Sequence, residues 1–117
     1  MKTMTREIDV SYYLVQEMIY VLEFLKKRFS INNKIYLDFT NGRDDYLPRH
    51  LDRIEIDEKR LDSEIRFVES ILRSYPYMDF VSETYLPDLY KLKKQYQSLR
   101  KKAIKALEDK KKEEEES

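Results

Sequence analysis

The chain has no cysteine and no tryptophan, and its 117 residues include one glycine, one histidine and three prolines. Without cysteine the sequence can form no disulfide, no zinc–thiolate site and no thiol nucleophile. Glycine and proline mark most turns, so their scarcity predicts long elements joined by few connections. These absences favour an all-helical protein, and they leave few of the residues from which catalytic sites are usually built.

Length and charge place further bounds on the chain. Its 117 residues correspond to one domain, and 23 basic residues balance 23 acidic ones. The most hydrophobic stretch, residues 10–25, contains Glu17 and Glu23 and is shorter than the ~20 residues that span a bilayer. Residues 1–9 have no continuous apolar run, so no signal peptide is expected. We therefore expect a cytoplasmic protein without a membrane partner.

Apolar residues recur at alternating steps of three and four in two segments, and this heptad spacing gives a helix one apolar stripe that must pack against another helix. The spacing predicts helices over about 48–74 and about 84–110. The two stripes are Leu51, Ile54, Glu58, Leu61, Ile65, Val68, Leu72 and Tyr75, and Tyr85, Leu89, Leu92, Tyr96, Leu99, Ala103 and Ala106. Glu58 is the one charge in the first stripe. Either it pairs with a cation of a facing helix, or the stripe begins at Leu61 and Glu58 is exposed.

The N-terminal segment predicts a helix over about 6–29 that is apolar around most of its circumference. Such a helix is either central in a bundle or shared with another chain. Tyrosine is enriched at protein interfaces because it buries a large area and keeps a polar group. The candidate protein interface is therefore placed on this helix, at Tyr12, Tyr13, Leu14, Met18, Tyr20, Val21 and Leu25.

Between residues 30 and 47 the apolar spacing changes. Ile35, Leu37 and Phe39 alternate with polar or amphipathic residues, as in a half-buried strand, and Asn41-Gly42 follows as a hairpin signal. Residues 53–57 also alternate and offer a strand partner. We prefer an extended loop over the bundle to a short β-hairpin, because Leu51 and Ile54 fit the helical stripe.

Charge is unevenly distributed in the C-terminal third of the chain. Residues 87–107 carry seven basic residues against Asp88 alone, a net charge of +6, whereas residues 113–116 are all glutamate. A basic helix face either binds phosphates, with salt-sensitive affinity, or is merely solvated. The candidate nucleic-acid contacts are Lys91, Lys94, Arg100, Lys101, Lys102 and Lys105. Residues 110–117 are low-complexity charge and are expected to be a disordered tail.

His50 is the one place where a metal or catalytic site could begin, because Asp44, Asp45, Asp52 and Asp57 lie near it in sequence. No paired-histidine, HExxH or EF-hand spacing is present, and no glycine-rich phosphate loop or nucleophile elbow occurs. We therefore expect no catalytic, cofactor-binding or metal-binding residues, no cofactor and no small-molecule substrate.

The sequence predicts an all-α fold of three long helices in an antiparallel bundle or coiled-coil-like hairpin. An extended loop or short hairpin is expected at 30–47, a single helical domain at 1–109 and the charged tail at 110–117. In size and helical character the chain resembles small helical subunits of nucleoprotein assemblies and small phage or archaeal-virus proteins. The expected function is that of a non-enzymatic interaction protein, homo-oligomeric or docked as a subunit or inhibitor on a larger complex. The alternative is a sequence-nonspecific nucleic-acid-binding module.

Overall fold

Three long helices make up most of the chain. The computed structural model describes the backbone of residues 2–116 and the side chains of residues 12–116. The helices are α1 (Lys2–Thr40), α2 (Leu47–Ser74) and α3 (Leu86–Glu116), and a π-helical turn, η1 (Val81–Tyr85), leads directly into α3. No residue from 2 to 116 lies in a strand. The all-α prediction is therefore confirmed.

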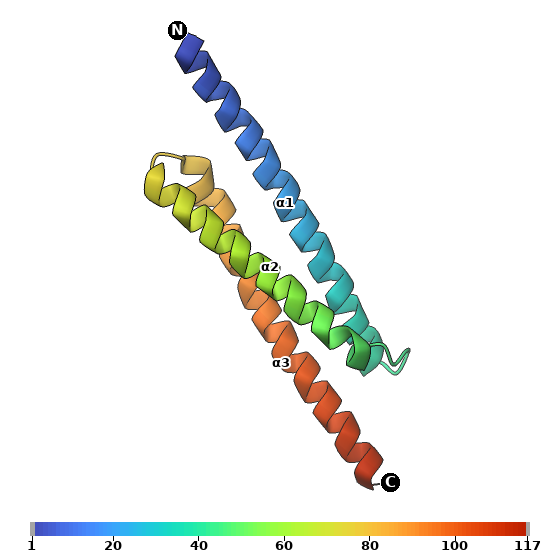
Figure 1. Ribbon diagram of the computed structural model, residues 1–117. Coiled ribbons are helices and arrows are strands. Elements are labelled where there is room, and N and C mark those ends of the chain that lie inside the picture. The colour runs from blue at the N-terminus through green and yellow to red at the C-terminus, as the bar shows by residue number, and fades with distance from the viewer. Residues whose placement is uncertain (1, 117) are drawn as a thin grey trace.

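The helices pack side by side in a staggered arrangement (Figure 1). The direction reverses from α1 to α2 and again from α2 to α3, so α1 and α3 run parallel to each other. The N-terminal end of α1 projects past the α2–α3 connection, and the C-terminal end of α3 projects past the α1–α2 loop. The molecule measures 75 × 22 × 18 Å. Within residues 2–116, no helix has both the length and the apolar character needed to cross a membrane.

The core lies along the contact lines between the helices and follows the predicted stripes. Burying a leucine, isoleucine or valine side chain contributes about 1.5–3 kcal/mol, so these contacts dominate the stability of the bundle. Phe29 of α1 meets the ring of Tyr96 edge-on, with centroids 5.1 Å apart. The buried residues of the two predicted stripes are Ile54, Leu61, Ile65 and Val68 in α2, Tyr85 in η1, and Leu89, Leu92, Tyr96, Leu99 and Ala103 in α3. Met18, Leu25 and Phe39 join them from α1.

The predicted extended loop at 30–47 is wrong, because α1 continues to Thr40. Ile35 and Phe39 are four residues apart and therefore share a helix face that packs on the core, whereas Leu37 is 45% exposed. The alternation of apolar residues reflected one exposed leucine between two core positions. It was not the repeat of a strand.

Asn41-Gly42 ends α1 instead of forming a hairpin. Gly42 has a φ of +72°, its N–H donates to the carbonyl of Phe39, and the N–H of Arg43 donates to the carbonyl of Asp38. This pair of bonds is the Schellman motif, which satisfies the last carbonyls of a helix and favours glycine at the left-handed position. The connection to α2 is thereby reduced to residues 41–46.

The π-helical turn η1 has a cause in the sequence. Pro87 lacks an N–H, and in a regular α-helix its ring would collide with the carbonyl of Glu83. In the wider turn the N–H of Leu86 donates to the carbonyl of Val81, five residues back. The wide turn provides room for Pro87 and allows the helix to continue.

The acidic and basic residues after 109 extend α3 to Glu116, where the sequence suggested a disordered tail; Ser117 lies outside the described residues. Lys110 forms an ion pair with Asp45 in the α1–α2 loop and lies 4.8 Å from the ring centre of Phe39. Residues 111–116 are exposed. These contacts hold α3 against the loop at one end of the bundle.

Candidate functional site

A buried polar network joins the three helices near the middle of the bundle. Asn32 of α1 has no exposed surface. Its Nδ2 donates to Asp57 Oδ2 of α2 at 2.9 Å and to the hydroxyl oxygen of Tyr96 of α3 at 3.1 Å. Its Oδ1 lies 2.6 Å from Nε2 of His50 and accepts a hydrogen bond from that nitrogen. One amide thus connects α1 to both of the other helices.

The negative charge of Asp57 is balanced by two arginines. Asp57 is 3% exposed, and its Oδ2 accepts hydrogen bonds from Arg28 Nε at 3.2 Å and from an Arg28 terminal nitrogen at 3.1 Å. Arg60 reaches Oδ1 at 3.7 Å. A buried carboxylate is tolerated when it is paired and hydrogen-bonded in this way, and leaving it unpaired is strongly destabilising.

The titration of the network follows from its burial. Burial, reinforced by the positive charge of Arg28, lowers the pKa of His50 below its ordinary value of 6.5, although the charge of Asp57 opposes this. Burial raises the pKa of Tyr96 to about 12, and the hydrogen bond from Asn32 opposes the rise. At neutral pH the imidazole is therefore neutral and the phenol is protonated. The network's hydrogen-bonding groups are directed at one another, an arrangement typical of a structural cluster.

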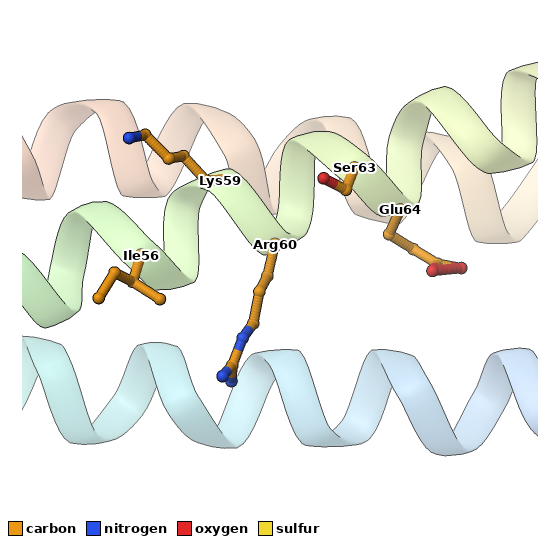
Figure 2. A pocket seen from close by; sticks show the side chains of 5 residues that line it. All are labelled: Ile56, Lys59, Arg60, Ser63 and Glu64. Atoms are coloured by element: carbon orange, nitrogen blue, oxygen red, sulfur yellow. The ribbon is translucent and has the colours of Figure 1, made fainter.

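The outer face of α2 shows no convergent chemistry. A shallow hollow of about 420 Å³ is lined by Ile56, Lys59, Arg60, Ser63 and Glu64, all from α2. Figure 2 shows these side chains spread along the helix, with Arg60 directed toward α1 and Lys59 directed away from it. Within residues 12–116, no three histidine or acidic side chains gather in a way that could hold a metal ion.

Glu58 resolves the alternative that the sequence left open. It is 8% exposed, and its Oε2 lies 2.7 Å from Nε of Arg100 on α3. Of the two alternatives, the structure shows the first, in which Glu58 pairs with a cation of a facing helix. Arg100 was predicted as a phosphate contact, but the structure turns it toward α2 and away from the lysines of α3. Lys93 is likewise paired, 2.9 Å from Asp62.

The other five predicted phosphate contacts lie together. Five of their ten pairs are separated by three, four, seven or eight residues, a spacing that places them on one outward face of α3. All five are exposed, and none of the ion pairs in the described part of the chain uses them. They are Lys91, Lys94, Lys101, Lys102 and Lys105.

The predicted protein interface on α1 divides into two sets. Tyr12, Tyr13 and Tyr20 are 61–74% exposed and lie on the surface. Met18 and Leu25 are buried in the bundle, and Leu14 and Val21 pack partly against the same core. The latter four cover α2 and α3 within the chain, so the interface prediction is corrected to exclude them.

Sequence reasoning missed an exposed stripe on α1. Six exposed positions, here called the α1 outer seam, follow one another at steps of four, three, four, three and four. The step pattern is visible in the sequence, but apolar core residues of α1 such as Met18 and Leu25 stand between its members and obscured it. Its apolar members are 39–74% exposed. The seam consists of Tyr13, Glu17, Tyr20, Phe24, Lys27 and Ile31.

The polar network gave a weaker signal in the sequence. Asn32 stood in the segment expected to form a loop, and Asp57 was considered only as a neighbour of His50 in sequence. Polar residues of a helix do not reveal their partners until the register between helices is known.

No family model, curated protein or solved structure matches the chain.

Proposed function

We propose that the protein is a non-enzymatic helical assembly protein that binds another protein through the α1 outer seam. The observation that carries the proposal is the exposure of Tyr13 (70%), Tyr20 (74%), Phe24 (45%) and Ile31 (39%) along one line of α1. Heptad spacing of this kind is typical of a helix that packs against a further helix. Within the chain, α2 and α3 leave this line uncovered.

The polar network supports the proposal because it determines which face of α1 points outward. A rotation or slip of α1 would withdraw Asn32 from Asp57, His50 and Tyr96 and leave buried polar groups unpaired. These contacts therefore fix which residues of α1 face the core and which form the outer seam. A fixed apolar line reduces the ordering cost of binding, since its side chains stand on a preorganised helix.

A photo-crosslinking amino acid at position 20 tests the proposal in an extract of cells that express the chain. We expect one discrete adduct, either with this chain or with another protein, that excess unlabelled protein suppresses. The control position is Tyr77, which is 91% exposed in the α2–η1 turn and lies outside the seam. Equal crosslinking at both positions, or none at position 20, would contradict the assembly function.

A second candidate function is sequence-nonspecific binding of nucleic acid by the lysine face of α3. The specific observation is that the five exposed lysines occupy a stretch, residues 89–107, that contains no acidic residue. Lysines that release condensed counterions on binding give an affinity that falls steeply with salt. The ion pair of Arg100 with Glu58 leaves the lysines as the available cations.

Charge reversal separates this candidate from a solvated face. Lys101→Glu with Lys102→Glu should weaken binding to a short single-stranded DNA of any sequence and flatten the salt dependence, which is about 0.7 per phosphate contact for single strands. Lys59→Glu on α2 is the matched control, because Lys59 is also exposed. If the wild-type chain shows no salt-sensitive binding in fluorescence anisotropy, the lysine face is solvated surface.

A further inference from the structure

The α1 outer seam is self-complementary, and we infer that its partner is a second copy of this chain, with the two α1 helices antiparallel. This inference rests on the proposed function and specifies the partner. The six positions are symmetric about residue 22: 13 with 31, 17 with 27, and 20 with 24. An antiparallel copy centred there places Tyr13 beside the partner's Ile31, Tyr20 beside the partner's Phe24, and Glu17 beside the partner's Lys27.

Charge distinguishes this arrangement from the parallel one. Glu17 and Lys27 are the two charged positions of the seam, and both are exposed. In the antiparallel pair each glutamate meets a lysine, twice per dimer. In a parallel pair glutamate would face glutamate and lysine would face lysine, and like charges at such positions oppose association. The sequence of the seam thus selects one orientation of the second copy.

Size is the second argument. Aromatic side chains carry about 150–250 Å² each, so the exposed fractions of the four apolar seam residues leave roughly 400 Å² of apolar surface in contact with water. A stable interface buries about 800 Å² per partner, half of which the seam supplies as an apolar centre. Glu17 and Lys27, the two exposed charged positions of the seam, add polar contacts within it. An isologous contact of this kind closes as a two-fold dimer.

Shape is also matched across the two-fold axis. Each layer of the pair combines one residue preceding position 22 with one following it, so Tyr13 meets the smaller Ile31, and Tyr20 meets Phe24. Pairing Tyr13 with the smaller Ile31 favours close packing at both ends of the seam, and Tyr20 and Phe24 form an aromatic pair near its centre.

The mass of the purified full chain, measured by light scattering or sedimentation over a range of concentrations, tests the inference. We expect a wild-type dimer at micromolar concentration and a monomer for Tyr20→Glu and for Phe24→Glu. Tyr77→Glu is the control and should remain dimeric. The seam residues are exposed, so these variants should keep the helical circular dichroism of the wild type; each mass is compared only after that check.

Charge exchange tests the orientation. Glu17→Lys alone and Lys27→Glu alone should each weaken dimerisation about tenfold, because two attractive pairs per dimer become repulsive. An equimolar mixture of the two single variants, and the double variant Glu17→Lys/Lys27→Glu, should recover wild-type affinity. In a parallel dimer the wild type, both single variants and the double variant would all bring like charges together and bind alike, and only the mixture would gain. Weaker binding in each single variant with recovery in the double variant is therefore specific to the antiparallel pair.

The outcomes also separate the inference from the function on which it rests. A wild-type chain that is monomeric at high micromolar concentration overturns the second-copy inference. If position 20 then still gives a discrete, competable adduct with a different protein, the assembly function stands with another partner. If position 20 gives neither a self-adduct nor an adduct with another protein, both the assembly function and the second-copy inference are contradicted. A dimer that survives Tyr20→Glu and Phe24→Glu also overturns the inference, because its contact lies elsewhere.

Discussion

Asn32 connects all three helices through one amide group, and its surroundings explain why a polar side chain is retained at a fully buried position. Its two donors and its acceptor meet Asp57, Tyr96 and His50. A leucine at position 32 would fill similar space but would remove the hydrogen bonds that Asn32 makes to Tyr96 and His50, and would leave Asp57 with its arginines alone. In coiled coils, a buried polar residue at a single core position fixes register at some cost in stability. We assign the same role to Asn32.

The first prediction concerns this residue. Asn32→Leu should lower the free energy of unfolding by about 2 kcal/mol, because buried partners lose their hydrogen bonds. Asn33→Leu is the matched control. Asn33 is the next residue along α1, is half-buried at the edge of a shallow groove and should change stability by less than about 0.5 kcal/mol. Urea denaturation measures both values. Equal effects at the two positions would show that the network contributes little.

His50 gives a pH dependence whose sign follows from its environment. The pKa of His50 is lowered in the folded chain, first by burial and then by the charge of Arg28, whereas the unfolded chain binds a proton near pH 6.5. The unfolded state therefore holds more protons just below that pH, and stability rises with pH there. The stabilisation is complete above pH 6.5 and is lost as pH falls through the lower pKa of the folded state.

The measurement is the midpoint of urea denaturation between pH 7.5 and pH 5. We expect a decrease toward acid pH in the wild type and a flatter profile in His50→Gln, which keeps a donor for Asn32 but does not titrate. Parallel profiles for the two proteins would mean that another group causes the pH dependence. Carboxylates titrate mainly at lower pH, and they contribute equally to both proteins.

At the scale of the elements, the sequence predicted what depends on periodicity and failed where a pattern had two meanings. The stripe around Ile54 and Leu61 and the stripe around Leu92 were predicted correctly, because heptad spacing has a direct geometric consequence in a helix. An Asn-Gly pair such as Asn41-Gly42 is typical both of a hairpin turn and of a helix end, since both need a left-handed glycine. The preceding residues decide between these roles, and there Ile35 and Phe39 were assigned the wrong period.

The candidate interface was predicted in part for a related reason. An apolar helix surface is readable from the sequence, so Tyr13 and Tyr20 were found. The division between side chains that cover the chain's own core and those that remain exposed requires the rotation of α1. That rotation is set by contacts such as Arg28 with Asp57, which join residues 29 positions apart. Phe24 and Met18 could not be assigned to different faces without it.

Gly42 provides a prediction at this scale. Gly42→Ala should lower stability by about 1 kcal/mol, because a residue with a Cβ is strained at a φ of +72°. An added Cβ meets no atom within 4 Å, so the cost is conformational and no steric clash contributes. Asn41→Ala, one residue earlier and equally exposed, should change stability by a few tenths of this amount. Thermal denaturation followed by circular dichroism compares the two, and a neutral Gly42→Ala would contradict the Schellman end of α1.

The whole molecule is a rod. Its radius of gyration is 19.0 Å, whereas a compact domain of this length has about 13 Å. The stagger of α1 against α3 is the cause, because the ends of both helices extend beyond their neighbours (Figure 1). A chain of this shape exposes a large surface for its mass, and a long seam on one helix is consistent with an assembly function.

Small-angle X-ray scattering provides the fourth prediction. The variant Tyr20→Glu, for which the dimer proposal expects a monomer, should give a radius of gyration near 19.0 Å and a longest dimension near 75 Å. Using this variant separates the shape of one chain from that of a dimer, whose larger mass is read from the forward scattering. A value near that of a compact domain would mean that α1 or α3 folds back on the bundle in solution.

The parallel course of α1 and α3 also bears on how the bundle responds to mechanical tension. The start of α1 and the end of α3 lie at opposite ends of the rod (Figure 1), so a load applied between them pulls the two helices along their common axis in opposite directions. Such a load shears the apolar contacts and the bonds of Asn32 together. It does not peel the helices apart one turn at a time, and the bundle is therefore built to resist stretching along its length.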